Sequence, residues 1–274
     1  DGTREWLKNQ TEYLQVKPIL QEHQGPQTAR NKGKEAAKGT YVKFLDDDDY
    51  LCKGALSEEI RRIEQTKSDV SFGNLHVKSS TDDFTIENKI NEDMACSLFT
   101  GTLKPMPHTF TYRQSILSDL QWDTSVPYYQ DADFAMSVAS KLPKVVQMNR
   151  TVATYRRHSQ ASITSERLND ELEKNLDWEA RIIWRGIEQL KNRDNMKNIH
   201  RESASTGIWQ WIHMMAPFNF RRFIFWYRKV RSLNPDFKPN RKYDVERLLD
   251  NIFSPLVTEL IFLLPRKIRA KCQT

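Results

Sequence analysis

The chain has 274 residues, of which 38% are hydrophobic and 28% charged, and it contains 9 glycines and 11 prolines. This composition is typical of a folded protein with one or two domains, and it excludes collagen-like, low-complexity and wholly disordered chains. No apolar run in the sequence approaches the roughly 18 residues that a membrane-spanning helix needs. The three cysteines, Cys52, Cys96 and Cys272, fit neither a disulfide framework nor a zinc knuckle, so a reducing compartment such as the cytoplasm is expected.

The net charge of +6 is unevenly distributed along the chain. Residues 201–274 carry 14 Lys and Arg against 6 Asp and Glu, whereas residues 1–200 carry 28 against 30. The basic character therefore belongs to the C-terminal part, which is expected to bind anions, either lipid headgroups or nucleic acid.

Helical and strand patterns alternate along the first 165 residues. The periodicity and the flanking glycines predict, in chain order, a helix over 28–38, a strand over 41–45, a helix over 53–67, a strand over 69–77, a helix over 131–142 and a strand over 144–156. Such alternation is typical of an α/β fold with a mostly parallel sheet. Residues 166–191 form one long helical pattern, and the rest is helical or irregular and rich in aromatic residues. We therefore predict an α/β domain over residues 1–165 and a helical, basic region over 166–274.

The strongest local feature is an acidic run, since residues 44–51 read FLDDDDYL. Four adjacent carboxylates repel one another, so their place at the carboxyl end of a predicted strand requires compensation by a cation or by hydrogen-bond donors. Open α/β sheets bind their ligands at this edge, and carboxylate oxygens suit Mg²⁺ or Mn²⁺. The alternative interpretation is a solvated acidic turn that caps the next helix.

The surroundings of the acidic run resemble the family 2 glycosyltransferases. Residues 25–33 read GPQTARNKG and residues 37–51 read AKGTYVKFLDDDDYL, close to the family patterns GxxxARNxG and AxGxYhxFLDxDDxL, where h is apolar. A weaker resemblance continues from Trp122 to Ser162 and extends the similarity to about 160 residues. It implies a GT-A fold, which is a Rossmann-like α/β sheet flanked by helices that binds a nucleotide-diphospho-sugar, followed here by a helical C-terminal extension.

The resemblance also implies roles for single residues at the donor site. Asp46 and Asp48 occupy the first and third carboxylate positions of the family's DxD motif, which contacts the sugar-nucleotide and holds Mg²⁺ or Mn²⁺ on its diphosphate, with Asp48 as the direct metal ligand. Asp49 is expected to cap the helix that follows. Arg30 is expected near the donor pocket, or alternatively in a structural ion pair under the acidic turn. Asp1, in a segment similar to the end of an Asp-Asp-Gly-Ser motif, is expected at the nucleotide.

The family's catalytic base is an acidic residue at the start of a helix, usually in a Glu-Asp pair. Residues 128–134 read YYQDADF, so Asp131 aligns with the base and Gln130 replaces the usual Glu. A carboxylate there removes the proton of the acceptor hydroxyl as its oxygen attacks the anomeric carbon. Alternatively, Asp131 only caps its helix while Asp133 stabilises the first turn.

Two histidines stand in further segments that are similar to the family. Residues 155–162 read YRRHSQAS and resemble the stretch YRxHxxS, which implies that His158 is an additional ligand of the metal or the diphosphate. A surface histidine is the alternative. His108, within PMPHTF at residues 105–110, resembles an acceptor-side segment.

The start of the chain differs from the family layout. Members open with an apolar strand and a second strand that precede the Asp-Asp-Gly-Ser motif, which together amount to roughly 35 to 45 residues, about the size of a βαβ unit or slightly more. We therefore expect the chain to be a fragment that is inactive, or nearly so, by itself.

The C-terminal region combines aromatic and basic residues. Residues 208–215 read IWQWIHMM and residues 218–230 read FNFRRFIFWYRKV. This composition is typical of a helix that lies on an anionic membrane surface, resembles some nucleic-acid surfaces, and also fits a buried packing face. Because bacterial relatives often use lipid-linked acceptors, a membrane is favoured over nucleic acid, which places the protein in the cytoplasm or at the inner face of the cell membrane.

Taken together, the residues and the resemblance predict an inverting glycosyltransferase. It moves a sugar from a nucleotide-sugar donor to the hydroxyl of a saccharide or lipid-linked acceptor in cell-surface polysaccharide or glycan synthesis. One alternative is a phosphoaspartyl phosphatase, because residues 46–50 approach the pattern DxDx(T/V), although Tyr50 stands at its last position. The other is a non-catalytic membrane-binding or nucleic-acid-binding module.

Overall fold

The computed structural model describes residues 2–10, 16–157 and 172–271. Six strands in this part of the chain form one sheet, in the order β1-β5-β3-β6-β2, with β4 paired to β3. The strands are β1 (Tyr41–Val42), β2 (Tyr50–Leu51), β3 (Val70–Lys78), β4 (Asp83–Ile86), β5 (Phe110–Arg113) and β6 (Val145–Arg156). An α/β architecture is confirmed, and the long strands β3 and β6 lie at the positions that the sequence predicts.

The sheet is mixed, so the expectation of a mostly parallel sheet is wrong for the neighbouring strands. Within the described residues only β3 and β6 pair in parallel, starting at Val70 and Val145, and the other pairs are antiparallel. Strands β1, β3 and β6 do run in one direction. The short aromatic strand β5 separates β1 from β3 and runs against both of them. An antiparallel neighbour needs no crossover helix, so the alternating helix and strand patterns do not reveal it.

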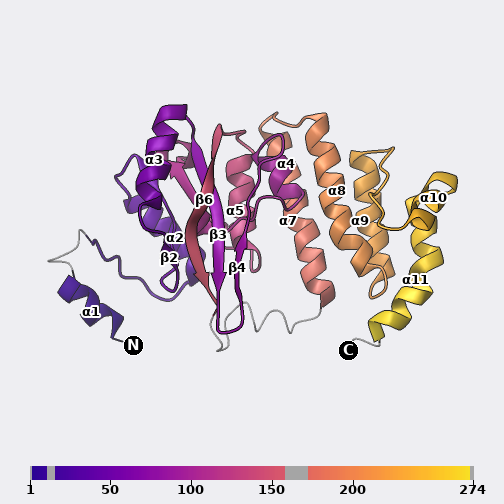
Figure 1. The fold of residues 1–274 in the computed structure, drawn as a ribbon, viewed down its shortest axis with the longest axis horizontal. Coiled ribbons are helices and arrows are strands. Elements are labelled where there is room, and N and C mark those ends of the chain that lie inside the picture. Colours follow the sequence, from indigo (N-terminus) through magenta and orange to yellow (C-terminus); the bar gives the residue numbers. More distant parts are fainter. Residues whose placement is uncertain (1, 11–15, 158–171, 272–274) are drawn as a thin grey trace.

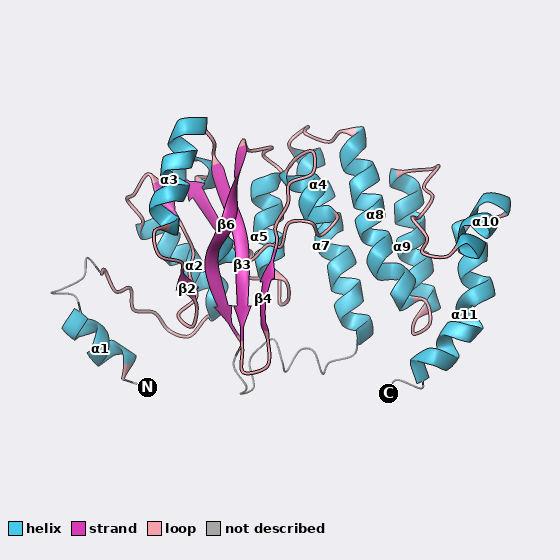
Figure 2. Ribbon diagram, in the orientation of Figure 1, coloured by secondary structure: helices cyan, strands magenta, loops and turns pink. Residues whose placement is uncertain are grey.

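Helices cover both faces of the sheet. In chain order they are α1 (Thr3–Gln10), α2 (Gly25–Ala36), α3 (Ala55–Thr66), α4 (Met94–Phe99), α5 (Gln130–Ala139), α7 (Leu172–Asn192), α8 (Asn198–Met215), α9 (Phe220–Leu233), α10 (Asp244–Ile252) and α11 (Pro255–Lys271). Figure 2 shows α3 on one side of the sheet and α5 on the other. Residues of β3 alternate between these sides: Phe72 belongs to the large core that includes α5, and Leu75 to the small core under α3.

The C-terminal region is helical, as the sequence predicts. Helices α7, α8 and α9 stand side by side next to α5 and lead to α10 and α11 at the C-terminal end (Figure 1). The predicted boundary at residues 165 and 166 lies outside the described residues. None of the helices that the structure describes is long and apolar enough to cross a membrane.

Most aromatic side chains of α8 and α9 pack inside the protein. Trp209, Phe223, Trp226 and Tyr227 are all buried. The Trp209 ring contacts the Phe223 ring with 6.0 Å between centroids. The buried-packing alternative therefore holds for these residues, and they are not available to a membrane.

The approach of α8 to α4 leaves no room for a side chain at Gly207. A Cβ atom at Gly207 would lie 2.0 Å from the main-chain oxygen of Phe99, which is backbone and cannot rotate away. We predict that Gly207→Ala lowers the free energy of unfolding by about 1 to 3 kcal/mol, the usual cost of overpacking a core. Urea unfolding followed by circular dichroism measures this change.

The matched control is Gly33→Ala in α2, where a Cβ atom would meet nothing within 4 Å. Because alanine favours a helix interior over glycine, this variant should be about 0.5 to 1 kcal/mol more stable than the wild type. Equal effects of the two substitutions would contradict the close packing of α4 and α8.

Candidate active site

The acidic turn at residues 46–49 follows β1 and precedes β2. Phe44, two residues before the turn, anchors it in the core. Its buried ring makes edge-to-face contacts with Trp122 at 5.3 Å and with Phe134 at 5.5 Å between centroids. Because a buried aromatic residue cannot move without leaving a cavity, Phe44 sets where the following carboxylates emerge.

Arg30 joins the acidic turn to the start of α5. Its Nη2 donates to Oδ1 of Asp46 at 2.7 Å and its Nη1 donates to Oδ1 of Asp131 at 3.0 Å. The guanidinium also lies over the Trp122 ring, 4.4 Å from the centroid. Three of the residues singled out in the sequence thus meet, although they belong to three separate segments.

The local environment raises the pKa of Asp131 to about 6. Burial is the largest cause and the negative charge of Asp46 adds to it, while Arg30 and His108 act in the opposite direction. A carboxyl group with such a pKa is ionised at neutral pH and is still a stronger base than an ordinary aspartate, which suits a general base.

Asp49 is turned inward, towards His108. Both side chains are buried, with Oδ2 of Asp49 3.0 Å from Nδ1 of His108. Oδ1 of Asp49 accepts a hydrogen bond from the main-chain N–H of Arg156 at 3.0 Å. Asp49 therefore does not cap α3, whose N-cap is Gly54, and that expectation is wrong. The contact joins residues 59 positions apart, and no local pattern in the sequence indicates it.

The end of β6 supports Asp48. Nε of Arg156 donates to the main-chain oxygen of Asp48 at 2.5 Å, and the guanidinium of Arg156 lies over the Tyr50 ring at 4.6 Å. Asp48 itself is half-buried. The acidic turn is thus held by arginines on two sides, Arg30 from α2 and Arg156 from β6.

Side chains at the turn have the composition of a divalent cation site. One ligand atom each from Asp46, Asp49 and His108 lie within 4.8 Å of one another. Nε2 of His108 is buried and has no hydrogen-bond partner, so this donor set has unused capacity. The carboxylate oxygens of this group suit Mg²⁺ or Mn²⁺. Of the predicted ligands, Asp46 belongs to this group and Asp48 to the same turn; His158, like Asp1, lies outside the described residues.

A second group of ligating side chains, Asp93, Cys96 and His200, lies between α4 and α8. Nε2 of His200 is 2.7 Å from Oδ2 of Asp93, and Nδ1 of His200 accepts from the main-chain N–H of Lys197. Burial raises the pKa of the Cys96 thiol to about 11, so it stays protonated. Because these groups satisfy one another, we assign the cluster to helix packing.

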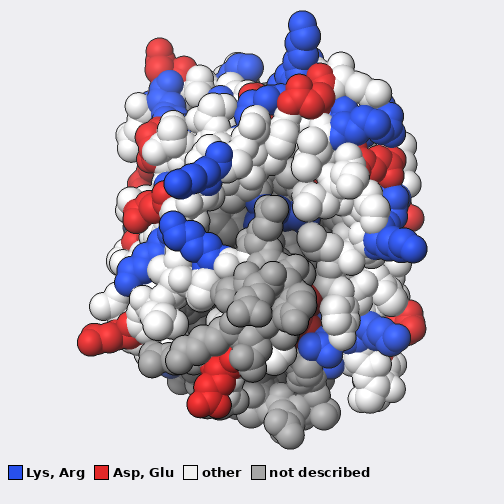
Figure 3. Space-filling model, turned by 90° about the vertical axis from the view of Figure 1, so that its left-hand side faces the viewer, with Lys and Arg blue, Asp and Glu red and all other residues white. Residues whose placement is uncertain are grey.

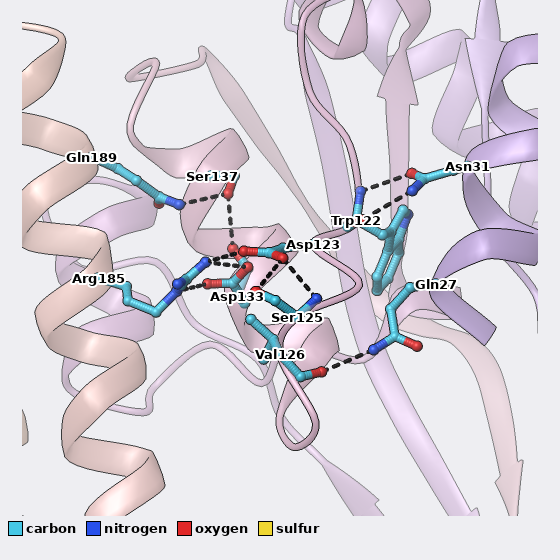
Figure 4. A network of polar contacts seen from close by, with 10 residues as sticks. All are labelled: Gln27, Asn31, Trp122, Asp123, Ser125, Val126, Asp133, Ser137, Arg185 and Gln189. Atoms are coloured by element: carbon cyan, nitrogen blue, oxygen red, sulfur yellow. Dashed lines mark hydrogen bonds and ion pairs between the residues drawn. The ribbon is translucent and has the colours of Figure 1, made fainter. Parts of the chain in front are cut away.

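The ARN segment of α2 also positions the loop at residues 122–126. The side-chain amide of Asn31 donates to the main-chain oxygen of Trp122 at 2.9 Å and its Oδ1 accepts from the main-chain N–H of Trp122 at 2.8 Å. Gln27 donates to the main-chain oxygen of Val126 at 2.9 Å. Figure 4 shows both contacts beside Asp123 and Asp133. Asn31 and Gln27 therefore matter for the site, and their roles were not predicted from the sequence.

The charge on the α2 and α3 side of the molecule is mixed. Figure 3 shows this face with Lys and Arg interspersed among Asp and Glu, and hollowed near its centre. Mixed charge agrees with the near balance of 28 basic and 30 acidic residues over residues 1–200.

Comparison with known proteins matches the first part of the chain to one sequence family. Residues 1–121 match the sequence model described as glycosyl transferase family 2. An uncharacterized glycosyltransferase of Nostoc is 34% identical over 169 residues, which cover 55% of this chain and 52% of that protein. The uncharacterized glycosyltransferase EpsJ of Bacillus subtilis is 26% identical over 154 residues, 52% of this chain and 44% of that protein. The chain thus spans about half the length of these curated relatives.

A solved structure shares the fold over nearly the whole chain. The crystal structure of Staphylococcus aureus TarS, residues 1–349, in complex with UDP-GlcNAc has a TM-score of 0.62 and 16% sequence identity, and the match covers 98% of this chain and 76% of that one. The predicted GT-A fold is confirmed. Both curated relatives are named as glycosyltransferases.

We predict that Arg30→Gln destabilises the protein more at about pH 8 than at about pH 5. Without the guanidinium, Asp46 and Asp131 are left as neighbouring carboxylates, and the pKa of Asp131, already about 6, rises further. A raised carboxyl pKa contributes stability below the unfolded-state pKa and loses it as pH rises through the folded-state pKa. The deficit against wild type should grow with pH to about 1 to 3 kcal/mol, because both carboxylates are partly exposed.

Urea unfolding at the two pH values measures this difference. The control is Arg113→Gln, whose ion pair with Glu64 at 3.4 Å lies at the surface. This variant should cost less than about 1 kcal/mol at both pH values. A deficit of Arg30→Gln that does not change with pH would show that Arg30 does not stabilise the ionised carboxylates.

Proposed function

We propose that this chain, whose residues 1–121 match the model of glycosyl transferase family 2, belongs to that family and transfers a sugar from a nucleotide-sugar donor to an acceptor hydroxyl with inversion at the anomeric carbon. The observation that carries the proposal is the Arg30 bridge between Asp46 and Asp131. It brings a group suited to a donor diphosphate next to a group suited to proton removal. A single displacement needs both groups at one place.

The donor side is supported by the acidic turn and by a structural neighbour. TarS, which shares the fold, was crystallised with UDP-GlcNAc. We place the donor diphosphate at Asp46 and Asp48, with Mg²⁺ or Mn²⁺ held by these carboxylates and assisted by His158. When bound, the cation neutralises charge that develops on the diphosphate leaving group. Arg30 and Arg156 keep the turn in shape through the contacts described above.

Asp131 is the proposed base. Its carboxylate accepts the proton of the acceptor hydroxyl while the oxygen forms a bond to the anomeric carbon. The bond between that carbon and the diphosphate oxygen breaks on the opposite side, and the diphosphate leaves with the electron pair. A pKa of about 6 keeps Asp131 ionised at neutral pH, and Arg30, 3.0 Å away, favours that ionised form.

We propose a saccharide or lipid-linked acceptor and a role in cell-surface polysaccharide or glycan synthesis. The support is the match to the family model together with bacterial relatives named as glycosyltransferases. A lipid-linked acceptor would require work at the inner face of the cell membrane, which we propose as the site of action.

The proposed roles predict different losses for two variants of the full-length protein. Asp48→Asn should abolish metal-dependent binding of the nucleotide sugar, because the cation loses a charged ligand. Asp131→Asn should keep donor binding and lower turnover by about 10² to 10⁴, the usual contribution of a general base. Calorimetry with UDP-sugars and Mn²⁺ measures the first effect, and a UDP-release assay the second.

Each variant can refute its assignment. Unchanged metal-dependent affinity in Asp48→Asn would remove Asp48 from the metal site. Equal loss of affinity and turnover in Asp131→Asn would mark Asp131 as structural. Asp47→Asn is the matched control, since Asp47 is exposed in the same turn, and both its affinity and its turnover should stay close to wild type.

Because most aromatic side chains of α8 and α9 are buried, we propose that the last two helices, α10 and α11, contact the membrane instead. Helix α10 exposes Val245, Leu248 and Ile252, and α11 exposes Leu260 and Ile261. The sequence of residues 266–271 adds four basic residues in six positions. Exposed apolar side chains near cations are typical of surfaces that bind anionic lipid.

We predict that the protein sediments with liposomes that contain anionic lipid and that added salt weakens this binding. The variant Leu248→Asp/Ile252→Asp should reduce the bound fraction at least about tenfold. It removes apolar area that the membrane would bury, and it adds negative charge that anionic lipid repels. Leu56→Asp, at an exposed position of α3, is the control and should bind like wild type. If the wild-type protein stays in the supernatant at low salt, the membrane proposal fails.

A further inference from the structure

Helix α5 presents two acidic side chains in opposite directions from its first turn. Asp131 faces Arg30 and the acidic turn, whereas Asp133, two positions later, faces Arg185 of α7. Residues two apart on a helix are separated by about 200° around its axis, so the two carboxylates hold the helix end from opposite sides. The start of α5 is thus held between two guanidinium groups, that of Arg30 from α2 and that of Arg185 from α7.

In the ion pair of Arg185 with Asp133, the aspartate side chain is buried. Nε of Arg185 donates to Oδ1 of Asp133 at 2.6 Å, and the Asp133 side chain is only 4% exposed. Burial raises the pKa of the Asp133 carboxyl and the Arg185 charge lowers it. A carboxylate at such a place needs its cation, because an unpaired buried charge is strongly destabilising.

The same guanidinium also holds the loop that precedes α5. Nη2 of Arg185 donates to Oδ2 of Asp123 at 2.7 Å, and Oδ1 of Asp123 accepts from the main-chain N–H of Ser125 at 2.8 Å. Figure 4 shows Arg185 reaching from α7 to both carboxylates, with Asn31 and Gln27 holding the loop from the other side. Loop and helix start are therefore tied to one arginine.

Capping does not fix the start of α5. The N-cap residue is Tyr129, whose backbone has the left-handed φ of 58° and whose side chain makes no capping hydrogen bond. This conformation is unfavourable for a residue that is not glycine and persists only where neighbouring contacts enforce it. The hydrogen bond between the Tyr129 and Glu179 side chains is another such contact from α7.

We infer that Arg185 is a positioning residue for the proposed base, and that α7 of the C-terminal region is thereby part of the active site. It acts through Asp133 and Asp123, which fix the direction of the first turn of α5 and so the place of the Asp131 carboxylate. This inference rests on the proposed function, because it assigns Arg185 to the step in which Asp131 removes a proton.

The test compares Arg185→Gln with Arg193→Gln in the full-length protein. Arg193 directly follows the last residue of α7 and contacts the other end of α5, with Nε donating to Oγ of Ser140 at 3.1 Å and Nη2 to Oδ2 of Asp119 at 3.3 Å. It makes the same kind of contact far from Asp131. Arg185→Gln should lower kcat about 10- to 100-fold with the KM for the donor unchanged, since small misplacement of a catalytic group has effects of this size. Arg193→Gln should stay within about twofold of wild type.

Two further variants separate positioning from general damage to the fold. Arg185→Lys keeps the charge and should restore kcat in part, because lysine cannot hold both carboxylates with one planar fork. Asp133→Asn combined with Arg185→Gln should lose less than the product of the single losses, because the buried charge is removed together with its partner. Loss of kcat to the same degree in Arg185→Gln and Arg193→Gln, or strictly multiplicative losses in the double variant, would overturn the inference.

Hydrogen exchange provides a measurement that does not depend on turnover. Amides of residues 133–136, the first in α5 that donate to main-chain oxygens of the helix start, should exchange faster in Arg185→Gln than in wild type or Arg193→Gln, because the first turn of α5 loses its anchor. If the wild-type protein transferred no sugar, the proposed function would fail, and exchange alone would decide whether Arg185 holds this turn. Unchanged exchange in Arg185→Gln would reject the positioning role whatever the activity.

Discussion

The candidate site depends on the placement of one cation, the guanidinium of Arg30, between two carboxylates. Asp46 and Asp131 are each partly exposed, and without Arg30 their charges would repel each other across the site. Arg30 can hold both because its planar fork donates in two directions while its face rests on Trp122. A lysine would supply the charge without this geometry. Arg30 therefore makes the structural ion pair that was one interpretation of it, and it does so beside the proposed donor site.

Packing beneath the site explains why this arrangement is rigid. The rings of Trp122 and Phe134 stack at 4.3 Å between centroids, and Phe44 meets both at their edges. These three rings come from the chain after β1, from the loop before α5 and from α5 itself, which are the segments that carry Asp46, Asp123 and Asp131. One aromatic cluster thus sets the distances between the polar groups above it. Polar contacts of Asn31 and Gln27 then fix the loop that the rings leave free.

The sequence predicts much of the fold, and the reasons for its failures are physical. Strand β6 and helices α2, α3 and α5 lie within a few residues of their predicted ranges, because each has a strong local periodicity. Strand β5 was not predicted, since it is only four residues long and pairs with strands that are distant in the sequence. At the site, the acidic run and Asp131 stand out through local patterns. The contacts of Asp49 with His108 and of Asp133 with Arg185 join distant segments and leave no pattern that a single sequence reveals.

Contacts between distant segments also join the two parts of the chain. A composition shift near residue 165 suggests that a catalytic domain ends and an appendage begins. In the structure, however, α7 lies along α5, and its side chains Glu179, Arg185 and Gln189 contact the segment from Tyr129 to Ser137. Polar contacts between helices fix one relative position, whereas apolar contacts tolerate small slides. A helix that carries a proposed base in its first turn gains precision from such contacts, so the helical region is better understood as a support of the site than as a separate module.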